Sequence, residues 1–155
     1  MQSYDLTDMR VVVADDNKPM RDILKGILRA FGIRKIFEAE NGRQALDHLI
    51  EHEVDLVIAD NMMSPINGVE LVSLIRAGAE GADPFTPFIM ISGFTDFKRI
   101  IEARDAGINE YLAKPISARQ VYRRISQVIE DPRGFVRSAT FFGPDRRRQP
   151  QAFDG

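Results

Sequence analysis

The chain has 155 residues, 44% of them hydrophobic, and a net charge of −2 at pH 7; these values predict one domain with a short appendage and disfavour nucleic-acid or membrane-surface binding. It contains no cysteine, so disulfides, thiolate catalysis and cysteine metal sites are excluded. No apolar run is long enough to span a membrane, and residues 1–5 lack the layout of a signal peptide, so we expect a cytoplasmic protein with no membrane span.

Five short segments are predicted to form strands: residues 9–14, 33–39, 54–60, 88–91 and 110–113. The apolar runs within residues 54–60 and 88–91 suit buried strands of a parallel sheet. Apolar residues at helical spacing follow each strand, within residues 20–31, 45–50, 69–75, 100–106 and 121–129, and the Gly- and Pro-rich residues 77–87 are predicted to form a loop. The alternation predicts right-handed crossovers and an α/β fold with helices on both faces of a parallel sheet.

Four of the five predicted strands end on residues that can do chemistry. Asp15 and Asp16 follow the first strand, Asp60 ends the third, Ser92 follows the fourth and Lys114 follows the fifth, whereas the second strand contributes nothing obvious. Each residue alone could be only a cap or a turn residue. Because ligands bind outside the carboxyl ends of parallel strands, we expect these side chains to converge on one site.

Such a site favours phosphoryl transfer. Three carboxylates in one place repel one another unless a cation lies among them, and oxygen ligands with several waters suit Mg²⁺. Lys114 would neutralise part of the remaining charge. A carboxylate beside Mg²⁺ and a lysine is suited to accept a phosphoryl group, because both cations stabilise charge on the transferring oxygens. Ser92 would donate a hydrogen bond to one of those oxygens.

Four motifs follow one another in a characteristic order. They are residues 11–17 (VVVADDN), 60–68 (DNMMSPING), 91–93 (ISG) and 106–115 (AGINEYLAKP). Together they make residues 8–130 resemble the receiver domain of two-component response regulators. The resemblance implies a flavodoxin-like (βα)5 doubly wound parallel sheet with strand order 2-1-3-4-5. We therefore assign residues 1–130 to a receiver domain and residues 131–155 to a C-terminal extension that contains Phe and Arg.

The resemblance also implies a role for each acidic residue. Asp60 matches the phosphoacceptor, Asp16 the direct Mg²⁺ ligand and Asp15 the acid that holds the metal through water. The backbone carbonyl of Met62 would be a further ligand, beside Asp60 itself. The implied protein is a signalling module and not an enzyme with turnover, since phosphatases that use an aspartyl phosphate commonly have a second Asp at the position occupied here by Met62.

Three further positions match functional residues of that family. Ser92 matches the hydroxyl residue that follows the phosphoryl group, and Lys114 the lysine that binds it, with a cis peptide expected between Lys114 and Pro115. Tyr111 matches the aromatic switch residue, although it could be an ordinary strand aromatic. The main departure is Ser64, which stands where the family usually has proline and would alter the loop after Asp60.

The resemblance implies protein partners on both sides of the signal. A histidine kinase or a histidine phosphotransfer protein would supply the phosphoryl group, and a downstream protein target would read it. We expect the target to bind the surface of the fourth helix, the fifth strand and the fifth helix. Its residues are Phe97, Lys98, Arg99, Tyr111 and Tyr122. The chain would act as a stand-alone receiver, and the alternative is an interaction module with a receiver fold that works without phosphorylation.

The extension and two histidines lie outside these motifs. Three Phe in eight residues of the extension are more than disorder favours, so we expect Phe141 and Phe142 to dock on the domain or a partner; a solvated tail is the alternative. His48 and His52 are four residues apart on a predicted helix and could bind a metal. No third ligand is evident, so we interpret them as solvated.

Overall fold

The computed structural model describes residues 4–93, 97–131, 135–137 and 142–144, with the backbone alone described for residues 97 and 135–137. The domain consists of β1 (Arg10–Ala14), α1 (Lys18–Ala30), β2 (Lys35–Ala39), α2 (Gly42–Glu51), β3 (Leu56–Asp60), α3 (Gly68–Arg76), a single turn η1 (Ala79–Gly81), β4 (Phe88–Ser92), α4 (Phe97–Ala106), β5 (Glu110–Ala113) and α5 (Ala118–Glu130). Two short strands follow, β6 (Phe135–Arg137) and β7 (Phe142–Pro144). The five main strands form one parallel sheet in the order β2-β1-β3-β4-β5, which confirms the predicted doubly wound, flavodoxin-like fold.

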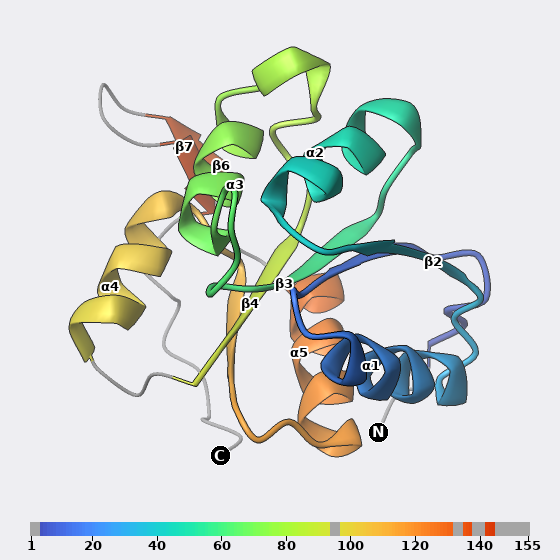
Figure 1. Cartoon of the computed structure of the whole chain (residues 1–155). Coiled ribbons are helices and arrows are strands. Elements are labelled where there is room, and N and C mark those ends of the chain that lie inside the picture. Colours follow the sequence, from blue (N-terminus) through green and yellow to red (C-terminus); the bar gives the residue numbers. More distant parts are fainter. Residues whose placement is uncertain (1–3, 94–96, 132–134, 138–141, 145–155) are drawn as a thin grey trace.

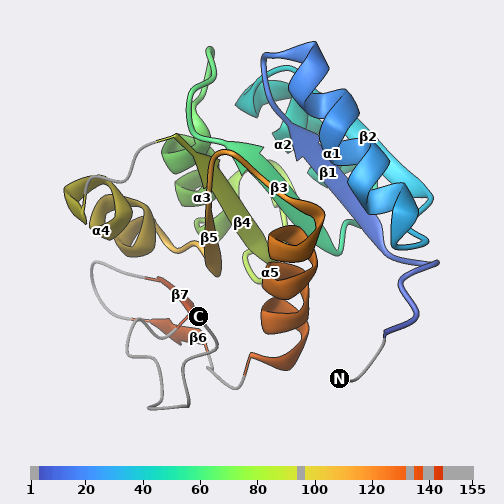
Figure 2. The same ribbon diagram turned by 90° about the horizontal axis from the view of Figure 1, so that it is seen from below.

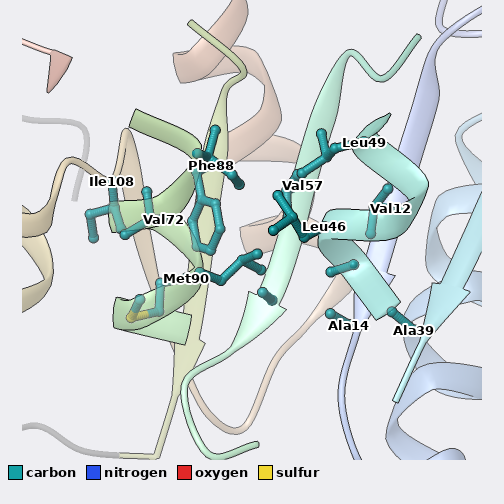
Figure 3. Close-up of a cluster of buried hydrophobic side chains, with 14 of the residues drawn as sticks. Val12, Ala14, Ala39, Leu46, Leu49, Val57, Val72, Phe88, Met90 and Ile108 are labelled. Atoms are coloured by element: carbon teal, nitrogen blue, oxygen red, sulfur yellow. The ribbon is translucent and has the colours of Figure 1, made fainter. Parts of the chain in front are cut away.

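Helices cover both faces of the sheet (Figure 1), and each face has its own hydrophobic core. Successive residues of a strand point to opposite faces, so β3 sends Val57 towards α2 and α3 and Ile58 towards α1 and α5. Figure 3 shows the first of these cores, in which Phe88 and Met90 of β4 lie beside Val57. Burial on both faces explains why β1, β3 and β4 are nearly continuous apolar runs.

Four helices are preceded by an N-cap residue whose side chain caps the first turn. Asn17, Asn41, Asn67 and Ser117 each accept a hydrogen bond from the backbone N–H three residues later, at the start of α1, α2, α3 and α5. These caps satisfy N–H groups that have no partner within the helix. The caps therefore fix the point at which the chain enters each of these helices after it leaves the carboxyl edge of the sheet.

Strand β2 begins at Lys35, two residues later than predicted. The N–H of Ile33 donates to the carbonyl of Leu28, and Gly32 has a φ of +92°, so this segment belongs to the end of α1. A left-handed residue just after a helix is the usual way to satisfy its last carbonyls, and glycine adopts that conformation without strain. Ile33 is fully buried although it lies outside the strand.

The loop between α3 and β4 is fixed by a buried guanidinium. Arg76 is 4% exposed and donates to the carbonyls of Gly107, Pro84 and Thr86 and to Oδ1 of Asn109, at 2.6 to 2.9 Å. Burial lowers the pKa of Arg76 to about 10, which still leaves the group charged at neutral pH. One side chain therefore ties the α3–β4 loop to the turn between α4 and β5.

Strands β6 and β7 form an antiparallel pair that lies beside α4 (Figure 2). The ring of Phe142 packs edge-on against Phe85 in the α3–β4 loop, with 5.3 Å between the ring centroids. Gly143 and Pro144 are buried, and the Phe142 carbonyl lies so close to Gly107 that a side chain there would touch it. The expected docking is thus seen for Phe142, while Phe141 lies outside the described residues.

None of the helices in the described ranges has both the length and the apolar character needed to cross a bilayer.

We expect the Phe85–Phe142 contact to hold the β6–β7 pair on the domain. Phe85→Ala and Phe142→Ala should each speed amide hydrogen exchange in both strands. In a double-mutant cycle, the free energies of strand opening obtained from this exchange should show a coupling of about 0.5–1.5 kcal/mol between the two rings, as for other aromatic pairs. Ile50→Ala removes an exposed side chain from α2 and is the control, with unchanged exchange in β6 and β7. Purely additive effects of the two substitutions would contradict docking through this contact.

Candidate functional site

The register of the sheet brings the four chemically active strand ends together. Ala14 of β1 pairs with Ala59 of β3, so Asp15 and Asp60 are the next residues on neighbouring strands. Ser92 pairs with the last residue of β5, and Lys114 follows directly. The predicted convergence is therefore present in the structure at the carboxyl edge of β1, β3, β4 and β5.

Asp60 is the centre of this group. It is 2% exposed, and its two carboxylate oxygens have different surroundings. Oδ2 accepts a hydrogen bond of 2.8 Å from the N–H of Met62, which fixes the plane of the carboxylate. Oδ1 lies 2.9 Å from Nζ of Lys114, and among the described residues it has no well-aligned hydrogen bond besides this ion pair. One oxygen is thus anchored, and the other faces a cation.

The pair of acids after β1 is divided between the interior and the surface. Asp15 is 3% exposed, and its Oδ1 accepts a hydrogen bond of 2.9 Å from the N–H of Asn17, whereas Asp16 is exposed. Burial raises the pKa of the Asp15 carboxyl, and repulsion from Asp60 acts in the same direction. The metal-free site is therefore strained electrostatically when all its carboxylates are ionised.

The carboxylates of Asp60, Asp15 and Asp16 change the pKa of Lys114. Burial by itself would lower the pKa of Lys114, but contact with the Asp60 carboxylate and the charges of Asp15 and Asp16 raise it above its ordinary value. The ammonium therefore stays charged at neutral pH. Three carboxylates face one ammonium, which leaves an excess of negative charge that favours binding of a further cation.

The donors of this site suit a hard divalent cation. Within residues 4–93, 97–131, 135–137 and 142–144, no three His, Cys, Asp or Glu side chains could hold a metal by themselves. Mg²⁺ does not need such a cage, because it usually keeps several waters and takes only one or two carboxylates. Asp15, Asp16 and Oδ1 of Asp60 are donors of that kind. The part expected of the Met62 carbonyl stays a prediction.

The chain turns back on itself directly after Asp60. The N–H of Gly68 donates to the carbonyl of Asn61, and the first turn of α3 then lies against the end of β3. A Cβ at Gly68 would be 2.9 Å from Cα of Asn61 and 3.0 Å from the Asp60 carbonyl. Only glycine allows this approach without a shift of the backbone. We did not predict this requirement, although the glycine itself marks the break in the sequence.

The rest of that loop is held by α2. Ile66 has a φ of 63°, which is rare for a branched residue, and its carbonyl accepts a hydrogen bond of 3.0 Å from the N–H of Gly42. A Cβ at Gly42 would clash with this carbonyl at 2.4 Å. The Ser64–Pro65 peptide in this loop is cis, and the effect expected of Ser64 on the loop stays a prediction.

Two other predicted residues have their place in the sheet. Tyr111 is partly buried on β5, where it pairs with Met90 and its carbonyl accepts a hydrogen bond from Nε of Arg124. Its switching role stays a prediction. The Lys114–Pro115 peptide is cis, as expected. Phe94, two residues after Ser92, lies outside the described residues.

His52 is exposed and His48 is partly exposed, in line with the expectation that both are solvated, but the two rings also make contacts within the fold. Their rings pack on Phe37 of β2, with centroid distances of 5.5 Å for His48 and 4.3 Å for His52. Nε2 of His48 also lies 2.7 Å from the carbonyl of Glu38. Their packing on Phe37 gives both histidines a structural role beside β2. The sequence offers no third metal ligand, but it could not show this packing.

Replacement of Asp15 tests the electrostatics of the site. A raised pKa in the folded state means that ionised Asp15 costs stability, and this cost grows as the pH rises through that pKa and is absent at low pH. Asp15→Asn should therefore stabilise the metal-free protein at pH 7 by roughly 1 kcal/mol, less at pH 4, and should weaken stabilisation by Mg²⁺.

Chemical unfolding at both pH values, with and without Mg²⁺, measures these effects. Asp8→Asn, at a carboxylate that is 97% exposed, is the control and should change neither. A metal-free Asp15→Asn protein that is less stable than the wild type at pH 7 would contradict the account.

Comparison with known proteins adds independent findings. The family model described as "Response regulator receiver domain" matches residues 11–126. The chain is 33% identical over 123 residues to chemotaxis protein CheY-3 of Vibrio cholerae (79% of this chain, 93% of the relative), and 34% identical over 122 residues to a CheY homolog of Campylobacter jejuni (78% and 92%). A receiver domain from an HD domain-containing protein of Pseudomonas fluorescens superimposes with a TM-score of 0.71 at 27% identity, covering 79% of this chain and 94% of that one.

Proposed function

Since the chain belongs to the response regulator receiver family, we propose that it accepts a phosphoryl group on Asp60 from a histidine kinase or a histidine phosphotransfer protein and signals through protein–protein contacts. The observation that carries this proposal is the buried Asp60 carboxylate, anchored through Oδ2 and 2.9 Å from Lys114 through Oδ1. We place the protein in the cytoplasm, where such partners would act.

The geometry suits in-line attack by Asp60. A carboxylate oxygen forms the new bond to phosphorus while the bond from phosphorus to the donor imidazole breaks, and the electron pair leaves with the imidazole nitrogen. Asp15, Asp16, Asp60 and the Met62 carbonyl would hold Mg²⁺, which when bound neutralises charge on the phosphoryl oxygens. Lys114 would exchange its ion pair with Asp60 for one with a phosphoryl oxygen. Ser92, buried at the end of β4, would donate a hydrogen bond from its hydroxyl to another phosphoryl oxygen.

Reading of the signal would take place on the side of α4, β5 and α5. Lys98 and Arg99 are exposed on α4, and Tyr111 is partly buried on β5, where a change of its side chain would alter this surface. Tyr122, which we expected in the same surface, packs edge-on against Phe31 of α1 at 5.2 Å, so its ring is engaged within the domain. Phosphorylation would shift a pre-existing equilibrium at this surface towards the conformation that a downstream protein target binds better.

The alternative is an interaction module that works without phosphorylation. It leaves the buried Asp15, the Asp60–Lys114 pair and the excess negative charge without a role, so we favour phosphorylation. We do not propose an enzyme with turnover, because Met62 occupies the position where a general acid would be needed.

Phosphoramidate carries a P–N bond like that of phosphohistidine and therefore replaces the unknown donor. With Mg²⁺, the wild type should gain the mass of one phosphoryl group, and removal of Mg²⁺ by a chelator should prevent the gain. Lys114→Met should slow the reaction by about 100-fold or more, because a preorganised cation is lost from the transition state. Intact-mass spectrometry over time measures the rates.

Lys35→Met removes a lysine at the other end of the sheet and is the matched control, with an unchanged rate. No mass gain in the wild type, under conditions where Mg²⁺ binding is measured, would favour the interaction module.

A further inference from the structure

A buried cation in α1 contacts the backbone of the acidic loop. Arg21 is 7% exposed, and its Nη1 donates a hydrogen bond of 2.6 Å to the carbonyl of Asp15. Its Nε donates to the Glu38 carboxylate at 3.1 Å. Glu38 lies on β2, the strand that contributes no group to the site directly. It therefore acts on the site through Arg21.

The guanidinium is held in one orientation. Glu38 also accepts a hydrogen bond of 2.8 Å from Nζ of Lys25, and this bond, together with that from Arg21, holds the pKa of the Glu38 carboxyl below its ordinary value. Glu38 is thus ionised at neutral pH and accepts a charge-assisted hydrogen bond from Nε of Arg21, in the plane of the guanidinium. A buried guanidinium needs such a partner, because an uncompensated buried charge is costly.

The acidic loop is fixed at three points. The N–H of Asp15 donates to the carbonyl of Ala39 at the end of β2, and Oδ1 of Asp15 accepts from the N–H of Asn17. The carbonyl of Asp15 is the third point and is held by Arg21. Arg21 also donates its own N–H to the carbonyl of Asn17 in the first turn of α1. The peptide that joins Asp15 to Asp16 is therefore oriented by this one side chain.

We propose that Arg21, with Glu38 as its anchor, is a positioning residue for the metal site. It fixes the Asp15–Asp16 peptide, so that both carboxylates are presented to Mg²⁺ without a cost of ordering the loop. The inference rests on the proposed function only in requiring that these carboxylates bind Mg²⁺. It does not require that phosphorylation occurs.

The charge of Arg21 and its positioning role predict opposite effects of its replacement on the affinity for Mg²⁺. A cation so near Asp15 opposes Mg²⁺ by electrostatics alone, so its removal would tighten binding if charge were its only effect. If positioning dominates, Arg21→Gln loosens the loop and weakens Mg²⁺ binding by about 10-fold, as is usual for groups that orient metal ligands. Arg21→Lys can still donate to the Asp15 carbonyl and should recover part of the loss.

Lys25→Met is the matched control. Lys25 binds the same Glu38 carboxylate, and among the described contacts its ammonium bonds only to Glu38 and Asp22. Its loss removes one positive charge from the same helix while the Asp15 carbonyl keeps its donor. Mg²⁺ affinity should therefore stay unchanged or rise slightly in this variant.

Titration calorimetry of the metal-free proteins with Mg²⁺ gives these dissociation constants. Phosphorylation by phosphoramidate should need about 10-fold more Mg²⁺ for half-maximal rate in Arg21→Gln, with a maximal rate at saturating Mg²⁺ within about twofold of the wild type. A tighter or unchanged dissociation constant in Arg21→Gln would overturn the proposal, as would an equal loss in Lys25→Met.

Glu38→Ala is the substitute variant, and the behaviour of the wild type separates this proposal from the proposed function. Should Arg21→Gln fail to fold, Glu38→Ala serves in its place, because it leaves the guanidinium without its anchor; weaker Mg²⁺ binding supports the proposal and unchanged binding overturns it. A wild type that binds Mg²⁺ but gains no phosphoryl group would contradict the proposed function, while the comparison of dissociation constants would still decide the role of Arg21.

Discussion

The ion pair between Asp60 and Lys114 is the interaction on which the site depends. The two residues stand at the ends of β3 and β5, with β4 between them, so the pair forms only if all three strands keep their register. A buried carboxylate without a partner would be costly, and the position of Lys114 after β5 is what makes burial of Asp60 tolerable. Asp15, Asp16 and a bound cation act on a carboxylate that is already fixed in this way.

The residues at the strand ends could be predicted from the sequence because a parallel sheet has a simple rule: its carboxyl ends meet at one edge. Asp15, Asp60, Ser92 and Lys114 follow apolar runs directly, and their convergence needs only the order of the strands. Arg21 could not be found in that way, since its guanidinium reaches a backbone carbonyl at Asp15, and no pattern of residue types records where a long side chain ends.

The contacts that shape the loops were equally hidden in the sequence. Gly42 and Gly68 are needed because a Cβ at either position would come within 2.4 or 2.9 Å of the backbone of another segment, well inside ordinary packing distance. The loop at residues 77–87 carried enough glycine and proline to be recognised. Its fixation by Arg76, and the seat that Phe85 offers to Phe142, depend on contacts between segments far apart in the chain. Such contacts follow from the assembled fold and not from local pattern.

The most direct test of the central claim is to locate the phosphorylated residue. An acyl phosphate on aspartate can be reduced with borohydride to a stable homoserine, which peptide mass spectrometry then places in the chain. After reaction with phosphoramidate and Mg²⁺, our account predicts homoserine at position 60 and nowhere else. Homoserine at position 15 or 16, or at a residue away from this edge of the sheet, would contradict it.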